Sequence, residues 1–193
     1  MTDESQKWSM GNVHPNSPTR NQLMSSKSIV NVVLVTPEIP QNTGNVIRLC
    51  ANVGARLHLV KPLGFRLDNS GLRRAALDYR DIADIVVHSS IEAFLESLPL
   101  YKIYGAITDG LTPYDSPRYL PGDAILFGPE SSGLPHELVS RLPSENRVRI
   151  PMKPSNRSLN LSNAVAIIVY EMWRQMDFRG TSHEALPNQS YFS

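Results

Sequence analysis

The chain has 193 residues and a formal net charge of +1; 41% of its residues are hydrophobic and 19% charged, as is typical of a globular protein with a core of its own. Its single cysteine, Cys50, excludes a disulfide framework or a cysteine-based zinc site within the chain, and its five histidines lack the spacing of metal ligands, so we expect no metal. No apolar run approaches the roughly 18 residues of a membrane-spanning helix, so we expect no contact with a membrane.

Residues 1–28 form the first segment, which is polar and rich in Ser, Asn and Pro. We expect a disordered extension there, because the segment has too few branched apolar residues to bury a core. It lacks the apolar stretch of a secretory signal, and Asp3 and Glu4 argue against an organelle transit peptide, so we expect a cytoplasmic protein. The globular domain is expected at 29–178 and a polar tail at 179–193.

Strands and helices are expected to alternate along residues 29–178. The nearly continuous branched apolar run at 29–36 is typical of a strand buried on both faces. Further strands are expected at 57–60, 85–88, 102–108, 123–128 and 147–150. Helices are expected from the end of a loop at 37–44 to Val53, around 72–77, and at 91–98, 135–142 and 161–176. This alternation predicts an α/β fold with a mostly parallel sheet flanked by helices.

Capping residues predict where the helices begin and end. Asn42 or Thr43 can cap the first helix, and Gly54 is a suitable residue at its end. Ser89 or Ser90 can cap the helix at 91–98 in the same way.

The helix at 161–176 is apolar on two sides. One helical stripe contains Leu161, Val165 and Ile168, and the opposite side contains Ile167 and Tyr170 rather than a run of charges. Such a helix has to be buried in its own core and again against a partner. We expect a homodimer whose interface includes Asn163, Tyr170 and Arg174.

Three loops of unusual composition, at 37–44, 128–133 and 151–160, follow predicted strands. Ligands of parallel α/β sheets bind beyond the carboxyl ends of the strands, which is where these loops fall. No glycine-rich nucleotide-binding loop occurs, and this disfavours a generic Rossmann nucleotide enzyme. Taken singly, Asn42 and Ser158 can be helix caps, Arg48 a surface residue and Glu130 a turn residue.

Taken in order, the loops contain three motifs. They are Pro37-Glu38-Ile39-Pro40-x-Asn42-Thr43-Gly44-Asn45-x-Ile47-Arg48, then Phe127-Gly128-Pro129-Glu130-x-x-Gly133-Leu134-Pro135, then Ile150-Pro151-Met152 with Ser158-Leu159-Asn160-Leu161-Ser162-Asn163-Ala164. Together they resemble the motifs of the SPOUT superfamily of RNA methyltransferases. The resemblance covers residues 29–178 and is strongest to the small members that methylate the ribose 2′-oxygen of the tRNA wobble nucleotide.

The resemblance implies features that composition and periodicity do not predict. It implies a C-terminal trefoil knot, S-adenosylmethionine as cofactor, and a homodimer whose active site is completed across the interface. It also implies the wobble cytidine or uridine of the tRNA anticodon loop as substrate.

The motifs assign roles to particular residues of this sequence. The implied cofactor site consists of Ala106, Gly128, Ile150 and Ser158. The implied catalytic residues are Arg48, Glu130, Ser158 and Asn160, with Asn42 supporting Arg48. Contacts with tRNA are expected from Asn42, Arg48, Arg73, Arg74 and Arg157.

The charges of the chain are unevenly distributed. Residues 48–80 contain seven basic and two acidic residues, 81–137 contain nine acidic and two basic, and 141–157 contain five basic and one acidic. If the two basic segments meet in space, they form a positive surface suited to phosphates. Charges scattered over solvated surfaces are an equally good interpretation.

The expected chemistry explains these residue types. Methyl transfer from a sulfonium to a ribose hydroxyl needs in-line alignment and loss of the hydroxyl proton. A free guanidinium has a pKa above about 12, so we expect Arg48 to orient a phosphate and the hydroxyl rather than to act as the base. Ser158 or a phosphate oxygen is then expected to receive the proton, and Glu130 to anchor Arg48 or loop amides.

Two alternatives remain open. The substrate could be another tRNA position or ribosomal RNA, although the first 28 residues supply no added RNA-binding domain. The chain could also be a catalytically silent RNA-binding module, although the complete set of polar motif residues argues against this.

Overall fold

The computed structural model describes residues 30–67, 83–98 and 102–181. Several predictions from the sequence therefore lie outside the described residues. They are the extension at 1–28, the short helix around 72–77, Arg73 and Arg74, and all but the first residues of the tail at 179–193.

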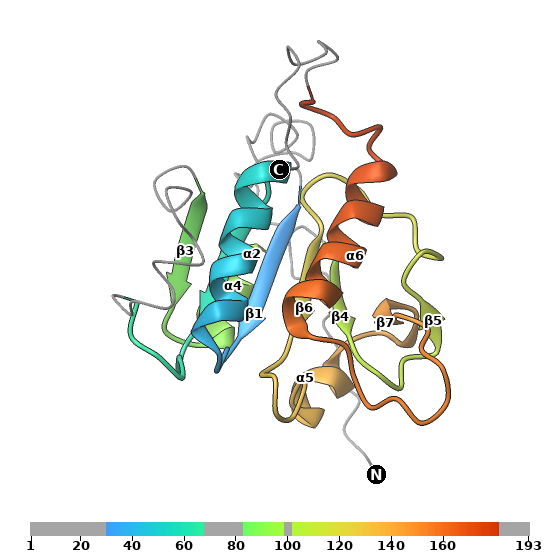
Figure 1. The fold of residues 1–193 in the computed structure, drawn as a ribbon, viewed down its shortest axis with the longest axis horizontal. Helices are drawn as coiled ribbons and strands as arrows, with labels where there is room; N and C mark the ends of the chain where they lie inside the picture. Colours follow the sequence, from blue (N-terminus) through green and yellow to red (C-terminus); the bar gives the residue numbers. More distant parts are fainter. Residues whose placement is uncertain (1–29, 68–82, 99–101, 182–193) are drawn as a thin grey trace, which may run out of the picture.

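Seven parallel strands form one sheet in the order β3-β2-β1-β6-β4-β7-β5 (Figure 1). The strands are β1 Asn31–Val35, β2 Arg56–Val60, β3 Asp84–His88, β4 Ile103–Ala106, β5 Thr112–Pro113, β6 Ala124–Phe127 and β7 Arg147–Arg149. The helices are α2 Pro40–Val53, α4 Ile91–Ser97, α5 His136–Arg141 and α6 Leu161–Arg174, with a 3-10 turn at Ser144–Asn146. The predicted α/β class with a parallel sheet is confirmed.

Strand β1 lies inside the sheet, and all five of its residues are buried. It pairs with β2 from Asn31 opposite Arg56 and with β6 from Asn31 opposite Ala124. A strand with neighbours on both edges and helices on both faces exposes no side to water, which is why its sequence is a run of branched apolar residues.

Helices cover both faces of the sheet. Helices α2 and α6 lie side by side on one face (Figure 1), where Val46, Cys50, Val165 and Ile168 pack in the same core cluster as Val32. Helices α4 and α5 contribute to a second cluster, in which their buried side chains pack with strand residues of the other face.

The first helix differs from its prediction at its beginning. Helix α2 begins at Pro40, so Asn42 and Thr43 lie inside it, and the predictions of a loop through Gly44 and of a cap at either residue are wrong. Proline suits the first helical position, because its ring fixes a helical φ and it lacks the N–H group that would go unpaired there. The predicted end is confirmed, since Gly54 has φ 69°.

Two other boundaries bear on the predictions. Ser90 caps α4, because its Oγ accepts a hydrogen bond of 3.2 Å from the Ala93 N–H. Of the two predicted caps, Ser89 and Ser90, the second is confirmed. The edge strand β5, Thr112–Pro113, was not predicted, because a two-residue strand that contains proline has no periodicity to detect.

A chain of buried polar groups crosses β1, β2 and β3. The Asn31 amide donates to the Gly122 carbonyl at 2.6 Å, which leaves its Oδ1 to accept from His58 Nε2 at 3.1 Å. His58 Nδ1 then accepts a hydrogen bond from His88 Nε2 at 2.8 Å. A neutral His58, with one donor and one acceptor nitrogen, therefore makes both of these hydrogen bonds. Burial, together with the neighbouring His88 and Arg56, lowers the pKa of His58 to about 3.

None of the helices in the described ranges has the length and apolar character needed to cross a membrane.

Candidate functional site

A pocket with a cavity volume of about 320 Å³ lies where the predicted loops converge. It opens at the carboxyl ends of β4, β6 and β7 and at the beginnings of α2 and α6. Its lining residues are Ile39, Asn42, Ala106, Ile107, Thr108, Phe127, Gly128, Pro129, Glu130, Val148, Ile150, Met152, Ser158, Leu159, Asn160, Leu161 and Ala164. All three motifs contribute to this one pocket.

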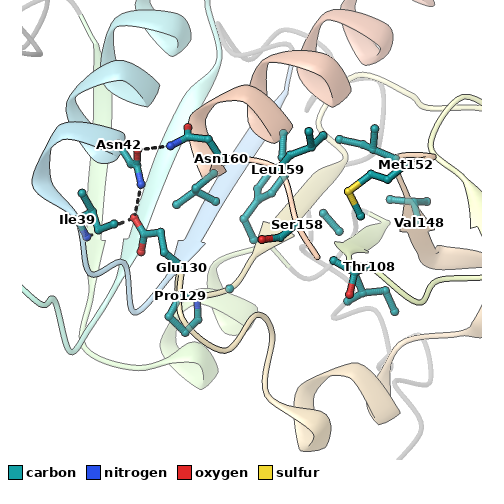
Figure 2. Close-up of a pocket in the computed structure, with 17 residues that line it drawn as sticks. Ile39, Asn42, Thr108, Pro129, Glu130, Val148, Met152, Ser158, Leu159 and Asn160 are labelled. Atoms are coloured by element: carbon teal, nitrogen blue, oxygen red, sulfur yellow. Dashed lines mark hydrogen bonds between the residues drawn. The ribbon is translucent and has the colours of Figure 1, made fainter. Parts of the chain in front are cut away.

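The pocket has a polar end and an apolar end (Figure 2). Asn42, Glu130 and Asn160 gather at one end beside Ile39, whereas Val148 and Met152 lie at the other, and Ser158 lies between them. A site of this kind can hold a ligand that has an apolar or aromatic part and a polar part.

Glu130 is held at the polar end by three donors. Its Oε2 accepts a hydrogen bond of 2.8 Å from the Glu38 N–H, and its Oε1 accepts from the Ile39 N–H at 3.2 Å and from Asn42 Nδ2 at 2.9 Å. The Glu38 and Ile39 N–H groups immediately precede α2, so a carboxylate from the second motif accepts hydrogen bonds from the N–H groups at the beginning of the first-motif helix. Glu130 thus anchors loop amides, which is one of the two anchoring roles expected of it.

Asn160 joins the third motif to the other two. Its Oδ1 accepts hydrogen bonds from the Ser162 N–H at 3.0 Å and the Asn163 N–H at 3.4 Å, so it caps α6. Because the oxygen is used by the cap, the amide nitrogen is the group that faces Asn42, and it donates to Asn42 Oδ1 at 2.9 Å. One residue therefore begins α6 and links the third-motif loop to the first turn of α2.

Gly128 is required by the backbone of its own loop. A Cβ at this position would overlap backbone atoms of Gly133 and Leu134, and Gly133 itself has φ 69°. The Gly133 N–H closes the turn by donating to the Pro129 carbonyl at 2.9 Å. The loop that lines the pocket can therefore pass this close to itself only with glycine at 128.

The four predicted cofactor residues, Ala106, Gly128, Ile150 and Ser158, all line the pocket. That they bind a cofactor stays a prediction. Three of the predicted catalytic residues, Glu130, Ser158 and Asn160, line it as well, and their roles in catalysis likewise stay predictions.

Arg48 and Arg157 lie elsewhere than the pocket wall. Arg48 is exposed on α2 and Arg157 is exposed in the loop before α6, and neither is among the described residues that line the cavity. The side chain of Asn42, expected to support Arg48, makes its hydrogen bonds with Glu130 and Asn160. Any role of Arg48 in the reaction therefore has to be exerted from outside the cavity of its own chain.

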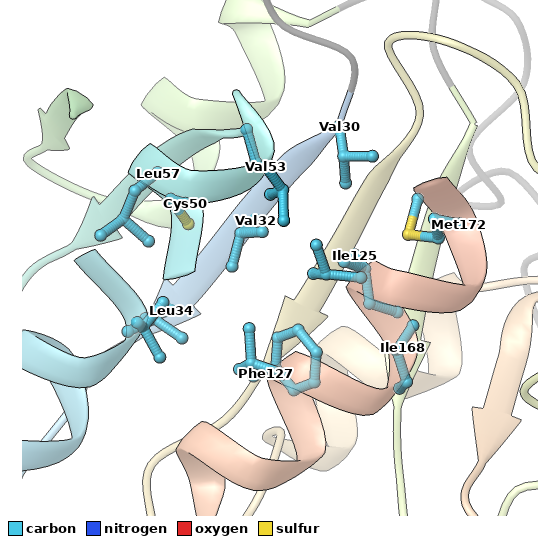
Figure 3. Packing of buried hydrophobic residues seen from close by; sticks show 14 of the residues in the cluster. Val30, Val32, Leu34, Cys50, Val53, Leu57, Ile125, Phe127, Ile168 and Met172 are labelled. Atoms are coloured by element: carbon cyan, nitrogen blue, oxygen red, sulfur yellow. The ribbon is translucent and has the colours of Figure 1, made fainter. Parts of the chain in front are cut away.

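Helix α6 has one face in the core and one exposed. Ile168 and Met172 point into the core (Figure 3), whereas Tyr170 remains 45% exposed. Asn163 and Arg174 are also exposed, and Arg174 Nε donates to the Glu171 carboxylate at 2.8 Å. The predicted interface residues thus lie on the outer face of α6, and the dimer stays a prediction.

Several basic residues are used within the chain. Arg56 forms an ion pair of 2.7 Å with Asp84, and Arg147 donates to the Leu142 carbonyl at 2.7 Å. Among the exposed ones, Arg149, Lys153 and Arg157 lie on β7 and the loop that follows it. Some of the described basic residues are therefore used in contacts within the chain, and others are exposed beside the third-motif loop. That the two basic segments form one positive surface stays a prediction.

Glu38 and Ser131 had no predicted role. Ser131 Oγ donates to Glu38 Oε1 at 2.8 Å, and the Ser131 N–H donates to Glu38 Oε2 at 3.0 Å. Glu38 is a specified residue of the first motif, which was the available signal, whereas Ser131 stands at an unspecified position of the second motif and had none. In the part of the chain that the structure describes, no group of three or more His, Cys, Asp or Glu residues could hold a metal ion.

A family model described as the SpoU rRNA Methylase family matches residues 29–170. The chain is 50% identical over 156 residues to the tRNA (cytidine(34)-2′-O)-methyltransferase of Aeromonas hydrophila, an alignment that covers 81% of this chain and 100% of the relative. A solved structure that gives insights into the 2-OH methylation of C/U34 on tRNA is 44% identical with a TM-score of 0.75, covering 80% of this chain and 100% of that one.

A more distant structure, an AdoMet-bound rRNA methyltransferase from Sinorhizobium meliloti, shares the fold with a TM-score of 0.70 at 24% identity, covering 78% of this chain and 58% of that one. The family match over residues 29–170 and the relative covered over its whole length confirm the resemblance drawn from the three motifs. This chain belongs to the SpoU rRNA methylase family.

Proposed function

We propose that this protein transfers a methyl group from S-adenosylmethionine to the ribose 2′-hydroxyl of the wobble cytidine or uridine in the anticodon loop of tRNA. The observation that carries the proposal is the 50% identity over the entire length of a tRNA (cytidine(34)-2′-O)-methyltransferase. The pocket supports it, because residues from all three motifs line one cavity.

The pocket suits the cofactor in size and in chemistry. Its volume of about 320 Å³ falls within the roughly 300–1,000 Å³ of small-molecule sites. The apolar end, with Val148 and Met152, suits an adenine ring. Ala106, Gly128 and Ile150 also line the pocket, and their small or aliphatic side chains leave room for a flat ring. When bound, S-adenosylmethionine supplies a methyl group on a positively charged sulfur.

The protein residues align the ribose and dispose of its proton. Transfer of the methyl group from bound S-adenosylmethionine would form a bond to the ribose oxygen and leave the electron pair of the broken carbon–sulfur bond on sulfur, so the hydroxyl proton would need an acceptor. Glu130 is a poor acceptor, because its two oxygens already receive three hydrogen bonds. A phosphate oxygen of the RNA takes the proton, either directly or through the hydroxyl of Ser158, which lies between the two ends of the pocket and passes on its own proton as it receives this one.

Arg48 orients the RNA from α2 with its planar guanidinium, which can bind a phosphate with two hydrogen bonds. Because α2 and α6 lie side by side, a second copy packed against the outer face of α6 also comes close to α2. We therefore assign the protein a homodimer through Asn163, Tyr170 and Arg174, with the active site completed across the interface. The C-terminal trefoil knot of the SPOUT superfamily belongs to the same proposal.

RNA contacts come from Arg48, Arg73, Arg74 and Arg157, whereas Asn42, which is 6% exposed, acts by positioning Glu130 and Asn160. Such contacts bind phosphates and leave the choice of nucleotide to the pocket. We expect the enzyme to act in the cytoplasm, on an anticodon loop whose unstacked bases are accessible.

The test is to incubate the purified protein with labelled S-adenosylmethionine and unfractionated tRNA, and to map the methylated ribose by mass spectrometry. Label at the wobble ribose is the expected result. Label only at another tRNA position, or only when ribosomal RNA is offered, would establish the alternative substrates. A protein that binds tRNA and transfers no label to any RNA would be a binding module.

A further inference from the structure

Two exposed residues, Glu38 and Ser131, are hydrogen-bonded to each other, and Glu38 is also one of the residues that hold Glu130. The Glu38 N–H donates to the Glu130 carboxylate at 2.8 Å, while the Glu38 carboxylate accepts from the Ser131 N–H at 3.0 Å and from its hydroxyl at 2.8 Å. Neighbouring residues on each loop thus donate to and accept from the other loop. We call the two hydrogen bonds between Glu38 and Ser131 the Glu38–Ser131 latch.

The latch lies outside the pocket, because neither Glu38 nor Ser131 is among the described residues that line the cavity. Pro129 and Glu130, which precede Ser131, do line it. The latch therefore reaches the cavity through the wall that it fixes.

The backbone of Glu38 is itself braced from the other side. The Gly64 N–H donates to the Pro37 carbonyl at 2.9 Å, and a Cβ on Gly64 would come within 2.8 Å of the Glu38 Cα. This contact is tighter than side chains tolerate, so residue 64 has to be glycine for Glu38 to stay in place. The loop after β2 thus sets the position of the latch.

From Glu38 the hydrogen bonds continue into the site. Glu130 holds Asn42 at 2.9 Å, and Asn42 accepts from Asn160 at 2.9 Å, at the beginning of α6. Disturbance of Glu38 is thus passed to each residue at the polar end of the pocket.

We propose that Glu38 and Ser131 are positioning residues of the methyltransferase, which lock the second-motif loop at residues 128–131 into the shape that binds the cofactor. This inference rests on the proposed function for the identity of the cofactor. Without the latch, the loop samples other conformations, so only a fraction of the molecules has the shape that binds the cofactor. The apparent affinity for the cofactor falls in proportion to that fraction.

The first experiment measures the Kd of S-adenosylmethionine by calorimetry and the kinetic constants for tRNA methylation. We expect Glu38→Ala to raise the cofactor Kd and KM about tenfold, with a smaller effect on kcat. Ser131→Ala removes only the hydroxyl and should raise the Kd by about threefold. Glu38→Gln keeps an acceptor oxygen and should restore part of the affinity. Glu96→Ala, on the exposed side of α4, is the matched control and should bind as the wild type does.

The double variant gives the sharpest result. If the two residues act through one contact, Glu38→Ala combined with Ser131→Ala should bind no more weakly than Glu38→Ala alone. Additive losses would overturn the latch, and so would a cofactor Kd of Glu38→Ala equal to that of Glu96→Ala. A different outcome is that the variants lose melting temperature in step with cofactor affinity, without rescue by Glu38→Gln. That result would show that Glu38 and Ser131 stabilise the fold and do not position the loop.

Amide hydrogen exchange of the cofactor-free protein separates this inference from the proposed function. Peptides that cover 128–134 should exchange faster in Glu38→Ala than in Glu96→Ala, because the Ser131 N–H loses its acceptor. Wild-type protein that fails to bind S-adenosylmethionine would defeat the proposed function, while this exchange would still report on the latch. Unchanged exchange at 128–134 would overturn the latch whatever ligand the protein binds.

Discussion

The side-chain amide of Asn160 donates a hydrogen bond of 2.9 Å to Asn42 Oδ1, across 118 residues of sequence. The same Asn160 caps α6, and the same Asn42 donates to Glu130. The beginning of one helix, the first turn of another and the second-motif loop are therefore held in one arrangement by two amides. Because every oxygen and nitrogen of those amides is used, single-atom substitutions can separate the functions of this contact.

Asn160→Asp and Asn160→Ala should differ in stability and agree in activity. Aspartate caps a helix as well as asparagine does, but it places an oxygen against Asn42 Oδ1, so the link is lost while the cap remains. Alanine loses both, and should lower the free energy of unfolding by about 1 kcal/mol. Urea denaturation and methylation rates measure the two effects. Full activity of Asn160→Asp would show that the link to Asn42 is dispensable.

Gly128→Val, and also Gly128→Ala, should weaken cofactor binding strongly. The first added carbon already overlaps the backbone of Gly133 and Leu134, so the loop has to move before any ligand is considered. Gly54→Ala is the control, because nothing lies within 4 Å of a Cβ added to Gly54, although its positive φ disfavours alanine. That control should cost about 1 kcal/mol of stability and leave the Kd unchanged. Calorimetry that finds wild-type affinity in Gly128→Ala would contradict the close approach.

Arg48→Ala should abolish methylation while cofactor affinity stays near that of the wild type. Arg48 is exposed on α2 and is not among the described residues that line the pocket, so its removal leaves the cavity wall intact. Arg48→Lys should also be poor, because a point charge does not reproduce a planar fork. Arg118→Ala, an exposed arginine outside the motifs, is the control for general loss of positive charge. Substantial turnover by Arg48→Ala would remove Arg48 from the mechanism.

Tyr170→Ala should weaken the dimer. Tyr170 is 45% exposed on the outer face of α6, and truncation of a large aromatic side chain at a well-packed interface costs more than about 1 kcal/mol. Light scattering over a dilution series should show dissociation at a higher protein concentration than in the wild type. Leu111→Ala, which truncates a side chain that is 84% exposed in a loop, should not shift the equilibrium. A fully active wild-type monomer at micromolar concentration would refute the dimer itself.

Stability should fall as the pH drops below the ordinary pKa of histidine. Burial, with His88 and Arg56 nearby, lowers the pKa of His58 in the folded protein to about 3, from 6.5. The unfolded chain therefore binds an extra proton between these values, so this contribution is complete above about pH 6.5 and declines at lower pH by at most about 1.4 kcal/mol per unit. Burial lowers the pKa of His88 as well, which acts in the same direction.

Urea denaturation between about pH 5.5 and 8 measures this slope where most carboxylates are already ionised. His136→Gln, which replaces an exposed histidine outside the buried polar chain, is the matched control. His58→Gln should flatten the slope, even though the variant is less stable overall. A slope that His58→Gln does not change would assign the acid sensitivity to other groups.

The site was predictable in outline because of a general property of parallel sheets. Segments at the carboxyl ends of neighbouring strands have to meet, and residues from the three predicted loops at 37–44, 128–133 and 151–160 do meet in one pocket, although the first of these segments is helical from Pro40. The beginning of α2 was not predictable in this way. The N–H groups just before α2 donate to the carboxylate of Glu130, which lies 92 residues from Glu38 in the sequence. No local sequence pattern contains that information.

The roles of Asn42 and Asn160 show the same limit. Both residue types favour helix caps, and the sequence offered Asn42 or Ser158 as caps, whereas Asn160 is the residue that caps α6. Local propensity identifies the kind of residue that ends a loop. Which of several candidates caps, and which bridges to another loop, depends on distances that only the folded chain defines.

The position of β1 has a consequence for synthesis of the chain. Its five buried residues pair with β2 soon after that strand is made, but its other edge pairs with β6, which begins only at Ala124 (Figure 3 shows the side chains that meet there). While the ribosome makes the intervening residues, one apolar edge of β1 stays open to any strand it encounters. We expect nascent chains that end before Ala124 to aggregate or to bind chaperones, and chains that extend past Phe127 to escape both.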